Sequence, residues 1–178
     1  MAEFLQPPEA EAKEDAAVQQ PALEEVLSAV ESFEHATLVT RSEGKLRSRP
    51  MAIADISDAG GFWFMTDAAS GKLDELAADP HVNIALQKGA RFCSISGTAR
   101  VVRDPAKAQA LWSEGQRAWF PDGPADARLV LIEVVPEYAE YWNRSGVEAL
   151  RYSFAAAQAI AMGRALGEDA GKHSKLKL

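Results

Sequence analysis

The sequence predicts a β-barrel with α-helical additions, an α+β fold whose strands are mostly antiparallel. Six or seven stretches rich in β-branched and aromatic residues follow one another, and glycine-containing turns separate several of them. Stretches with helical periodicity occur near both ends and between strands, and no internal repeat is present. At 178 residues, the chain has the size of one domain and is long enough to bury a core.

Three parts of the chain differ in composition. Residues 1–20 form an acidic arm rich in Ala, Pro and Gln, which we expect to be disordered because it offers little apolar surface to bury. Residues 21–168 form the folded domain. Residues 169–178 are a polar, basic tail, which we expect to be frayed.

The domain begins with an amphipathic helix after Pro21, whose apolar residues at helical spacing are Leu23, Val26, Leu27, Val30 and Phe33. Strands are expected over 36–41, 47–54, 62–67, 82–87, 91–103 and 127–135, and helices over 70–79, from Asp104 onward and over 150–166. Pro50 removes a ladder donor, which indicates an edge or a bulge, and Gly97 indicates a bulge or bend. Asp104 is the expected N-cap of its helix, and Pro136 is expected to interrupt the last strand.

The composition excludes several classes of function. With 19 basic and 26 acidic residues the net charge is −7, which argues against non-specific binding to nucleic acid or to an anionic membrane. No apolar run approaches the ~20 residues that span a bilayer and no signal peptide opens the chain, so we expect a cytoplasmic protein. The three histidines are scattered and Cys93 is expected to be a small buried residue, so no metal site is predicted.

The most informative stretch runs from Arg47 to Lys72. Alternation along its first strand places Arg47, Arg49, Met51 and Ile53 on one face. Two arginines beside an apolar pair would cost free energy in a closed core, and they are tolerated where that face meets water or an anion. On residue type alone, a solvated strand face is the slightly simpler explanation.

Thr66, Ser70 and Lys72 lie around the start of the helix that follows. Backbone N–H groups, a hydroxyl and an ammonium at such a place suit a phosphate group. Simpler explanations exist, because Ser is a preferred N-cap worth roughly 1 kcal/mol without any ligand, and a helix lysine is usually solvated. The stretch is not a nucleotide P-loop, since Thr66 stands where that pattern needs Gly and Leu73 where it needs Ser or Thr.

In their order along the chain, these motifs resemble the FMN-binding split barrel of the pyridoxamine-5'-phosphate oxidase superfamily, and most closely its bacterial general stress protein branch. The segments that carry the likeness are RSRPM, the strand end MT, SGK at the helix start, DPHVNIALQ, FCSISGTARVVRDPAKAQALW and VLIEVVPEYAEYWN. The likeness covers roughly residues 22–165. It implies a split β-barrel that forms a homodimer, with FMN bound at the interface.

The resemblance also assigns residues to the cofactor. In similar proteins the arginine before the extended segment contacts the flavin near its phosphate, and the backbone that follows lies along the isoalloxazine edge. An aromatic residue at the place of Trp142 approaches the flavin, often from the second subunit, although a core or interface role is the usual fate of tryptophan. Arg47 stays ambiguous. The expected cofactor-binding residues are Arg49, Pro50, Met51, Met65, Thr66, Ser70, Lys72 and Trp142.

The implied reaction is hydride or electron transfer between FMN and a small-molecule redox partner, in a protein with a stress-related role. No catalytic acid, base or substrate-binding residue can be named. The family's true oxidases carry a C-terminal Arg/His segment that binds pyridoxal phosphate, whereas here AAAQAIAMGRALG follows Trp142, which puts that substrate in doubt. Three alternatives stay open: a stress protein that stores or sequesters flavin without turnover, a relative that binds deazaflavin or haem, and a structural dimer without cofactor.

Overall fold

A computed structural model describes residue 28, residues 30–143 and residues 172–177. The expected acidic arm, most of the first helix and the helix over 150–166 lie outside the described residues. Val30, in the last described helical position, and Phe33, which follows the helix after a turn, are both buried in the core. The expected helix therefore ends before Phe33, although both residues are buried as predicted.

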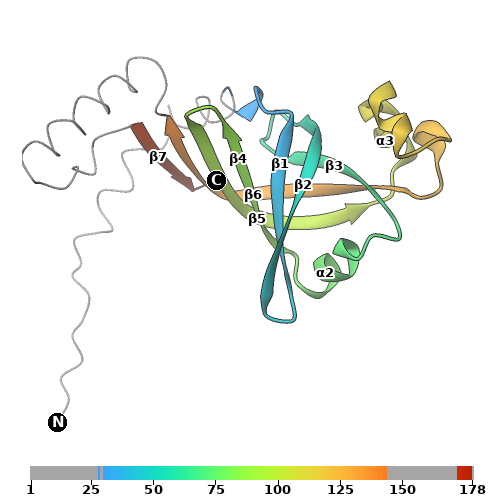
Figure 1. The fold of residues 1–178 in the computed structure, drawn as a ribbon, viewed down its shortest axis with the longest axis horizontal. Coiled ribbons are helices and arrows are strands. Elements are labelled where there is room, and N and C mark those ends of the chain that lie inside the picture. The colour runs from blue at the N-terminus through green and yellow to red at the C-terminus, as the bar shows by residue number, and fades with distance from the viewer. Residues whose placement is uncertain (1–27, 29, 144–171, 178) are drawn as a thin grey trace, which may run out of the picture.

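The described residues form a six-stranded antiparallel barrel with a seventh strand added to it (Figure 1). The strands are β1 (His35–Ser42), β2 (Lys45–Ile56), β3 (Phe62–Asp67), β4 (His81–Lys88), β5 (Arg91–Val102), β6 (Leu129–Asn143) and β7 (Lys172–Lys177). They lie in the order β3-β2-β1-β4-β5-β6-β7, and β3 also pairs with β6, which closes the barrel. The predicted β-barrel with helical additions is therefore confirmed.

Two short helices connect strands. Helix α2 (Lys72–Ala78) follows β3 and packs against β1, and helix α3 (Pro105–Leu111) follows β5. As predicted, Asp104 is the N-cap of α3, because its carboxylate accepts a hydrogen bond of 3.0 Å from the Lys107 backbone N–H. Helix α3 ends at Leu111, and two 3-10 turns (Glu114–Ala118 and Gly123–Ala125) lead to β6.

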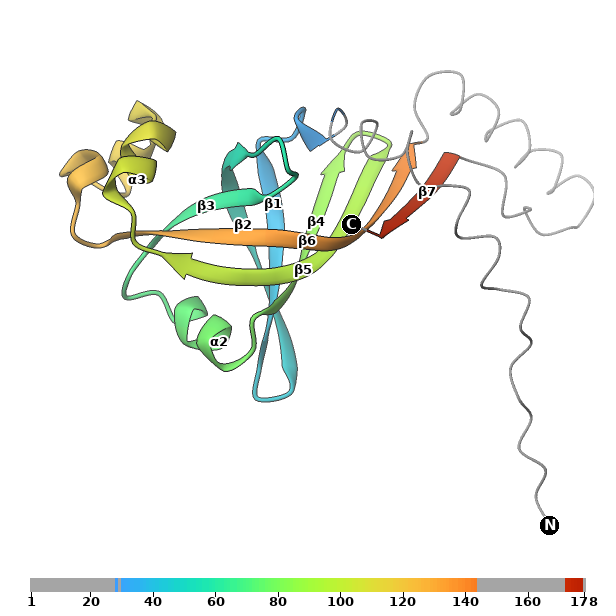
Figure 2. The same cartoon turned by 180° about the vertical axis from the view of Figure 1, so that it is seen from behind.

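Two apolar clusters hold the described structure together. The larger one contains buried side chains from the barrel strands and α2, among them Leu38, Phe64, Ile84 and Ile132. The smaller one lies between α3 and the first part of β6, and includes Trp63 and Leu131. Figure 2 shows α3 near one end of the long strand β6 and β7 at the other end.

The bulge predicted at Gly97 is present. The register between β5 and β6 shifts there, since Ser96 lies opposite Tyr138 while Gly97 lies opposite Pro136. The strands approach so closely that a Cβ atom on Gly97 would lie 2.1 Å from the Val135 carbonyl oxygen. Only glycine fits this position without a shift of the backbone.

Pro136 does not interrupt the last strand, which corrects the sequence-based expectation. Strand β6 continues to Asn143, and the extra residue of the bulge falls next to the proline. On the opposite edge of β6, pairing with β3 ends at Val134 and pairing with β7 begins at Tyr138. Pro136 therefore lies between these two pairings and beside the bulge, where strand hydrogen bonds are already interrupted. Its missing N–H consequently removes no regular strand hydrogen bond.

The C-terminal tail also differs from expectation. Residues Lys172–Lys177 form β7, which pairs with Tyr138–Asn143 of β6, where we expected a frayed end. Strand pairing at an edge is made by backbone groups, so a polar and basic sequence can take part in it without apolar side chains.

Candidate functional site

The basic stretch of β2 lies on an exposed edge of the barrel. Residues 45–52 of β2 pair with β1, but pairing with β3 begins only at Ile53. Pro50 consequently costs no hydrogen bond on the open side, which fits the predicted edge position. Alternation places Met51 in the core while Pro50 and Ala52 are exposed.

Arg49 is held by two buried groups on neighbouring elements. Its Nη1 donates to the Thr40 hydroxyl at 2.8 Å, and its Nη2 donates to Glu75 Oε2 at 2.6 Å. Thr40 lies on an inward-facing position of β1, and Glu75 lies in the first turn of α2. The Thr40 hydroxyl in turn donates to Glu75 Oε2 at 2.5 Å. The network therefore ties β1, β2 and α2 together at one point.

Glu75 is a buried carboxylate, with 8% of its surface exposed. The hydrogen bond from Thr40 and the bond and charge of Arg49 hold the pKa of Glu75 below its usual value, although burial acts in the opposite direction. Arg47 adds a longer contact, from its Nη1 to Glu75 Oε1 at 3.3 Å. Glu75 is therefore charged at neutral pH and faces two arginines.

Lys72 has a different environment. Its Nζ donates to the hydroxyls of Thr66 and Ser70, each at 2.7 Å. Burial and the nearby charge of Arg49 lower the pKa of Lys72, while Glu75 and Asp67 oppose this shift. Within the described part of the chain, no carboxylate forms a salt bridge with this ammonium group.

Ser70 does not cap helix α2, so the simpler explanation of this residue is wrong. The N-cap is Gly71, and no side chain accepts a capping bond there. The Ser70 hydroxyl instead accepts the bond from Lys72.

One pocket lies between the open edge of β2 and the start of α2. We refer to it as the candidate pocket, and its lining residues are Arg47, Ser48, Arg49, Pro50, Met51, Ser70, Gly71, Lys72 and Glu75. Three of these side chains are cationic and one is a carboxylate, so the walls carry a positive balance in a protein whose net charge is −7. Such a pocket suits an anionic group.

The fold brings together most of the predicted site residues. Arg49, Pro50, Met51, Ser70 and Lys72 line the candidate pocket. Thr66 is buried behind it and is joined to it through Lys72. Met65 points elsewhere and packs with the apolar cluster under α3.

Trp142 does not line the candidate pocket of its own chain. On β6, Val130 is the residue opposite Thr66, and Trp142 follows it 12 residues later, near the end of the strand. Trp142 instead lies opposite the exposed Phe92 of β5. Its predicted approach to the flavin from a second subunit stays a prediction.

Sequence reasoning missed Thr40 and Glu75. The available signal was positional: Glu75 stands one helical turn after Lys72 in a helix predicted to begin beside a basic strand. An acidic residue in such a place is usually solvated, so the pattern alone gave no reason to expect a buried network.

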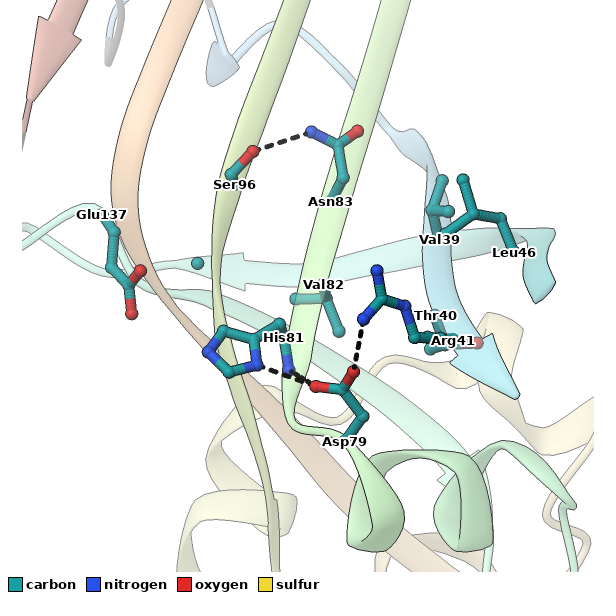
Figure 3. Close-up of a pocket in the computed structure, with 11 residues that line it drawn as sticks. Val39, Thr40, Arg41, Leu46, Asp79, His81, Val82, Asn83, Ser96 and Glu137 are labelled. Carbon is teal, nitrogen blue, oxygen red and sulfur yellow. Dashed lines mark hydrogen bonds and ion pairs between the residues drawn. The ribbon is translucent and has the colours of Figure 1, made fainter. Parts of the chain in front are cut away.

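A second pocket lies beside this network, and Figure 3 shows its lining residues. Asp79 accepts hydrogen bonds from the His81 backbone N–H at 3.1 Å and lies 2.7 Å from the ring Nδ1. Arg41 is 3.6 Å from the other carboxylate oxygen. The hydrogen bonds of His81 lower the pKa of Asp79. Asp79 precedes the first residue of β4 by two positions, so these bonds are a local side-chain-to-backbone turn at the start of that strand and need no ligand to explain them.

Two other sequence-based points concern cysteine and membranes. Cys93 is buried as predicted, and burial raises the pKa of its thiol to about 12. Among the helices that the structure describes, none is long and apolar enough to cross a membrane.

Comparison with known proteins identifies the family. A family model described as "Pyridoxamine 5'-phosphate oxidase like" matches residues 21–166. The chain belongs to the pyridoxamine 5'-phosphate oxidase-like family. The resemblance noted from the RSRPM and SGK motifs is thereby confirmed, and the fold fits the split barrel of the family's solved structures.

Three individual relatives share between 20% and 36% sequence identity with this chain. Protein bli-3 of Neurospora crassa is 36% identical over 110 residues, which cover 55% of this chain and 52% of that protein, so the match spans about half the length of the curated relative. The structure of a general stress FMN/FAD binding protein from Xanthomonas citri is similar with a TM-score of 0.63 and 26% identity, covering 71% of this chain and 92% of that one. General stress protein 26 from Bacillus anthracis shares the fold, with a TM-score of 0.63 at 20% identity over 68% and 94% of the two chains.

Proposed function

We propose that this chain binds FMN in the candidate pocket and acts as a flavin-dependent oxidoreductase with a stress-related role. One observation carries the proposal: the fold gathers five of the eight predicted cofactor residues around one pocket with a positive charge balance. Membership of the pyridoxamine 5'-phosphate oxidase-like family supports it, as does the likeness to the FMN/FAD binding protein of Xanthomonas citri.

The environment of Lys72 fits the phosphate of FMN. The described partners of this partly buried ammonium group are the neutral hydroxyls of Thr66 and Ser70, and no described carboxylate lies within salt-bridge distance of it. A phosphate oxygen next to Lys72 and Ser70 would supply an opposite charge and accept charge-assisted hydrogen bonds. Thr66 would keep the lysine side chain in place.

The open edge of β2 fits the flavin ring. Near Pro50 and Met51 the outer side of β2 pairs with no described strand, so backbone groups there are free to bond a planar ring. FMN itself would supply the capacity for one- and two-electron transfer with a small-molecule redox partner, such as a nicotinamide donor or another small reductant. The protein's part is to bind the phosphate and to orient the ring.

We further propose that the active form is a homodimer in which Trp142 approaches the pocket of the other subunit. Exposed apolar side chains on β2, β5 and β6 support this proposal, among them Leu46, Phe92 and Val135. Exposed apolar side chains are typical of an interface where they lie together in one patch. Light scattering of the purified protein tests the oligomeric state.

The cofactor is tested by fluorescence titration of FMN, with riboflavin in parallel, into wild-type protein and Lys72→Ala. We expect tight FMN binding, weaker riboflavin binding, and about a tenfold or greater loss of FMN affinity in the variant with little change for riboflavin. Lys45→Ala is the matched control, because Lys45 is exposed on β2 and does not line the pocket. Equal affinities for the two flavins would contradict the phosphate assignment, and absence of flavin binding would remove the function.

Turnover is tested on the FMN-loaded protein. Reduction of the bound flavin by a nicotinamide donor and its reoxidation by an acceptor are expected for an oxidoreductase. Bound FMN that no donor or acceptor cycles would identify the storage alternative. An intense Soret band or a deazaflavin spectrum in the protein as purified would identify the other cofactors.

A further inference from the structure

Glu75 occupies the place that an anion would take on Arg49. Glu75 is 8% exposed, and its carboxylate receives bonds from three donors, the Thr40 hydroxyl, the Arg49 guanidinium and the Arg47 guanidinium. It also lines the candidate pocket. The pocket therefore contains a resident carboxylate among its three cations.

Arg49 and Lys72 consequently differ in how readily they can bind an anion. Arg49 has an opposite charge 2.6 Å away, and both of its terminal nitrogens are already hydrogen-bonded to the protein. Lys72 contacts hydroxyl groups only, as far as the described residues show. An incoming phosphate that approaches Arg49 also approaches the Glu75 carboxylate, because that carboxylate lies 2.6 Å from the guanidinium. The negative charges of the phosphate and of Glu75 repel each other in a partly buried site.

We propose that Glu75 determines how strongly the candidate pocket holds a phosphate group, by competing with that group for Arg49. Lys72 then provides most of the charge-dependent affinity, and Arg49 acts mainly as the partner of Glu75. This inference rests on the proposed function, and it adds a residue that limits the affinity for the phosphate of FMN. The consequence is a flavin that exchanges more readily than the number of cations suggests.

A different role for Glu75 predicts the opposite result. If the carboxylate served only to orient Arg49 for the phosphate, its neutralisation would weaken phosphate binding, because a flexible guanidinium loses more entropy when it binds. Glu75→Gln separates the two roles, since glutamine keeps the size and a hydrogen-bonding end group but removes the charge.

The test measures dissociation constants of FMN and riboflavin for wild-type protein, Glu75→Gln and the control Asp74→Asn. Asp74 is exposed in the same turn of α2 and lies outside the candidate pocket, so its variant reproduces the change in net charge alone. We expect Glu75→Gln to bind FMN about tenfold more tightly at low salt, and riboflavin within about twofold of wild type. The control should stay within about twofold for both ligands. Weaker FMN binding, or an equal change for riboflavin, would overturn the proposal.

Inorganic phosphate distinguishes a failure of this inference from a failure of the proposed function. Its binding is followed by the rise in the unfolding temperature of the same three proteins. If no flavin binds but Glu75→Gln is stabilised by phosphate more than the other two proteins are, the competition holds and the flavin function does not. If phosphate stabilises Glu75→Gln no more than wild type, and FMN binds both equally, the competition is absent.

A double variant covers the case in which Glu75→Gln does not fold. Arg49→Met/Glu75→Leu removes both charges together and leaves no unpaired buried ion. Because the proposal gives most of the phosphate affinity to Lys72, this protein should bind FMN within about threefold of wild type. A loss as large as that of Lys72→Ala would show that Arg49 binds the phosphate directly, and would overturn the proposal.

Discussion

Lys72 opens helix α2 and donates a hydrogen bond of 2.7 Å to the hydroxyl of Thr66, a buried residue near the end of β3. The bond joins the strand to the helix across the turn between them. It also fixes the ammonium group at the wall of the candidate pocket. We therefore propose that Thr66 affects ligand binding through Lys72.

Thr66→Val should weaken FMN binding about three- to tenfold while riboflavin binding stays within about twofold. Valine keeps the shape of threonine but removes the hydroxyl, so Lys72 retains only the bond to Ser70. Titration of both flavins measures the effect. Thr98→Val, on β5 and away from the pocket, is the control, and an unchanged ratio of the two affinities in Thr66→Val would disprove the role of Thr66.

The network around Glu75 should make stability depend on pH. The hydrogen bond from Thr40, and then Arg49, lower the pKa of Glu75 from 4.5 in the folded protein. A carboxyl whose folded pKa is depressed contributes stability that is present above its unfolded pKa and is lost as the pH falls through its folded pKa. The Glu75 contribution should thus be complete at pH 7 and decline below about pH 4.5.

Urea unfolding of wild type and Glu75→Gln between pH 7 and pH 3 measures this contribution. We expect the variant to be less stable by about 1–3 kcal/mol at pH 7, with the difference shrinking on acidification. Asp74→Asn controls for the change in net charge. Parallel stability curves for wild type and Glu75→Gln would show that the carboxylate is not coupled to folding.

The barrel could be predicted from the sequence because local signals and the fold agree. Alternation along β1 and β2, the turn before Phe62 and the N-cap Asp104 all depend on residues near one another in the chain, and the bulge between β5 and β6 is indicated locally by Gly97. Pro136 was misread because its tolerance depends on the end of β3 and the start of β7, which are distant in sequence.

The site was only partly predictable for the same reason. Arg49, Ser70 and Lys72 belong to recognisable motifs, and the fold places them in one pocket. The partners of Arg49 do not: Thr40 lies on β1, and Glu75 is buried where α2 packs against that strand. A single sequence shows charges but not which charge neutralises which, so the unequal roles of Arg49 and Lys72 appear only in the folded chain.

Gly97→Ala should destabilise the barrel by about 2–4 kcal/mol or prevent folding. The added methyl group would lie 2.1 Å from the Val135 carbonyl oxygen and 2.9 Å from the Pro136 Cα, both backbone atoms that cannot rotate away. Chemical unfolding measures the loss. Gly115→Ala is the matched control, since a Cβ there would meet its nearest atom, the Ser113 hydroxyl, at 3.9 Å. Equal stability of the two variants would mean that β5 and β6 separate at the bulge at little cost.

Mixing two defective variants should restore flavin sites if Trp142 and Lys72 of different subunits share a pocket. Each variant, Lys72→Ala or Trp142→Ala, lacks one component of every site in its own homodimer. A mixed dimer has one site with both substitutions and one with neither, so random exchange of subunits should return about a quarter of the sites to wild-type affinity. Titration with FMN after unfolding and refolding the mixture together counts the tight sites.

The same mixing experiment distinguishes a site within one chain from a shared one. If both residues served a pocket of their own subunit, every site in the mixture would lack one component and no tight site would appear. Trp142 does not line the candidate pocket of its own chain, so we expect the shared arrangement. Wild-type affinity of the Trp142→Ala homodimer would remove the residue from the site altogether. Lys45→Ala mixed with Trp142→Ala is the control, because the lysine variant keeps its pocket and should itself retain tight sites.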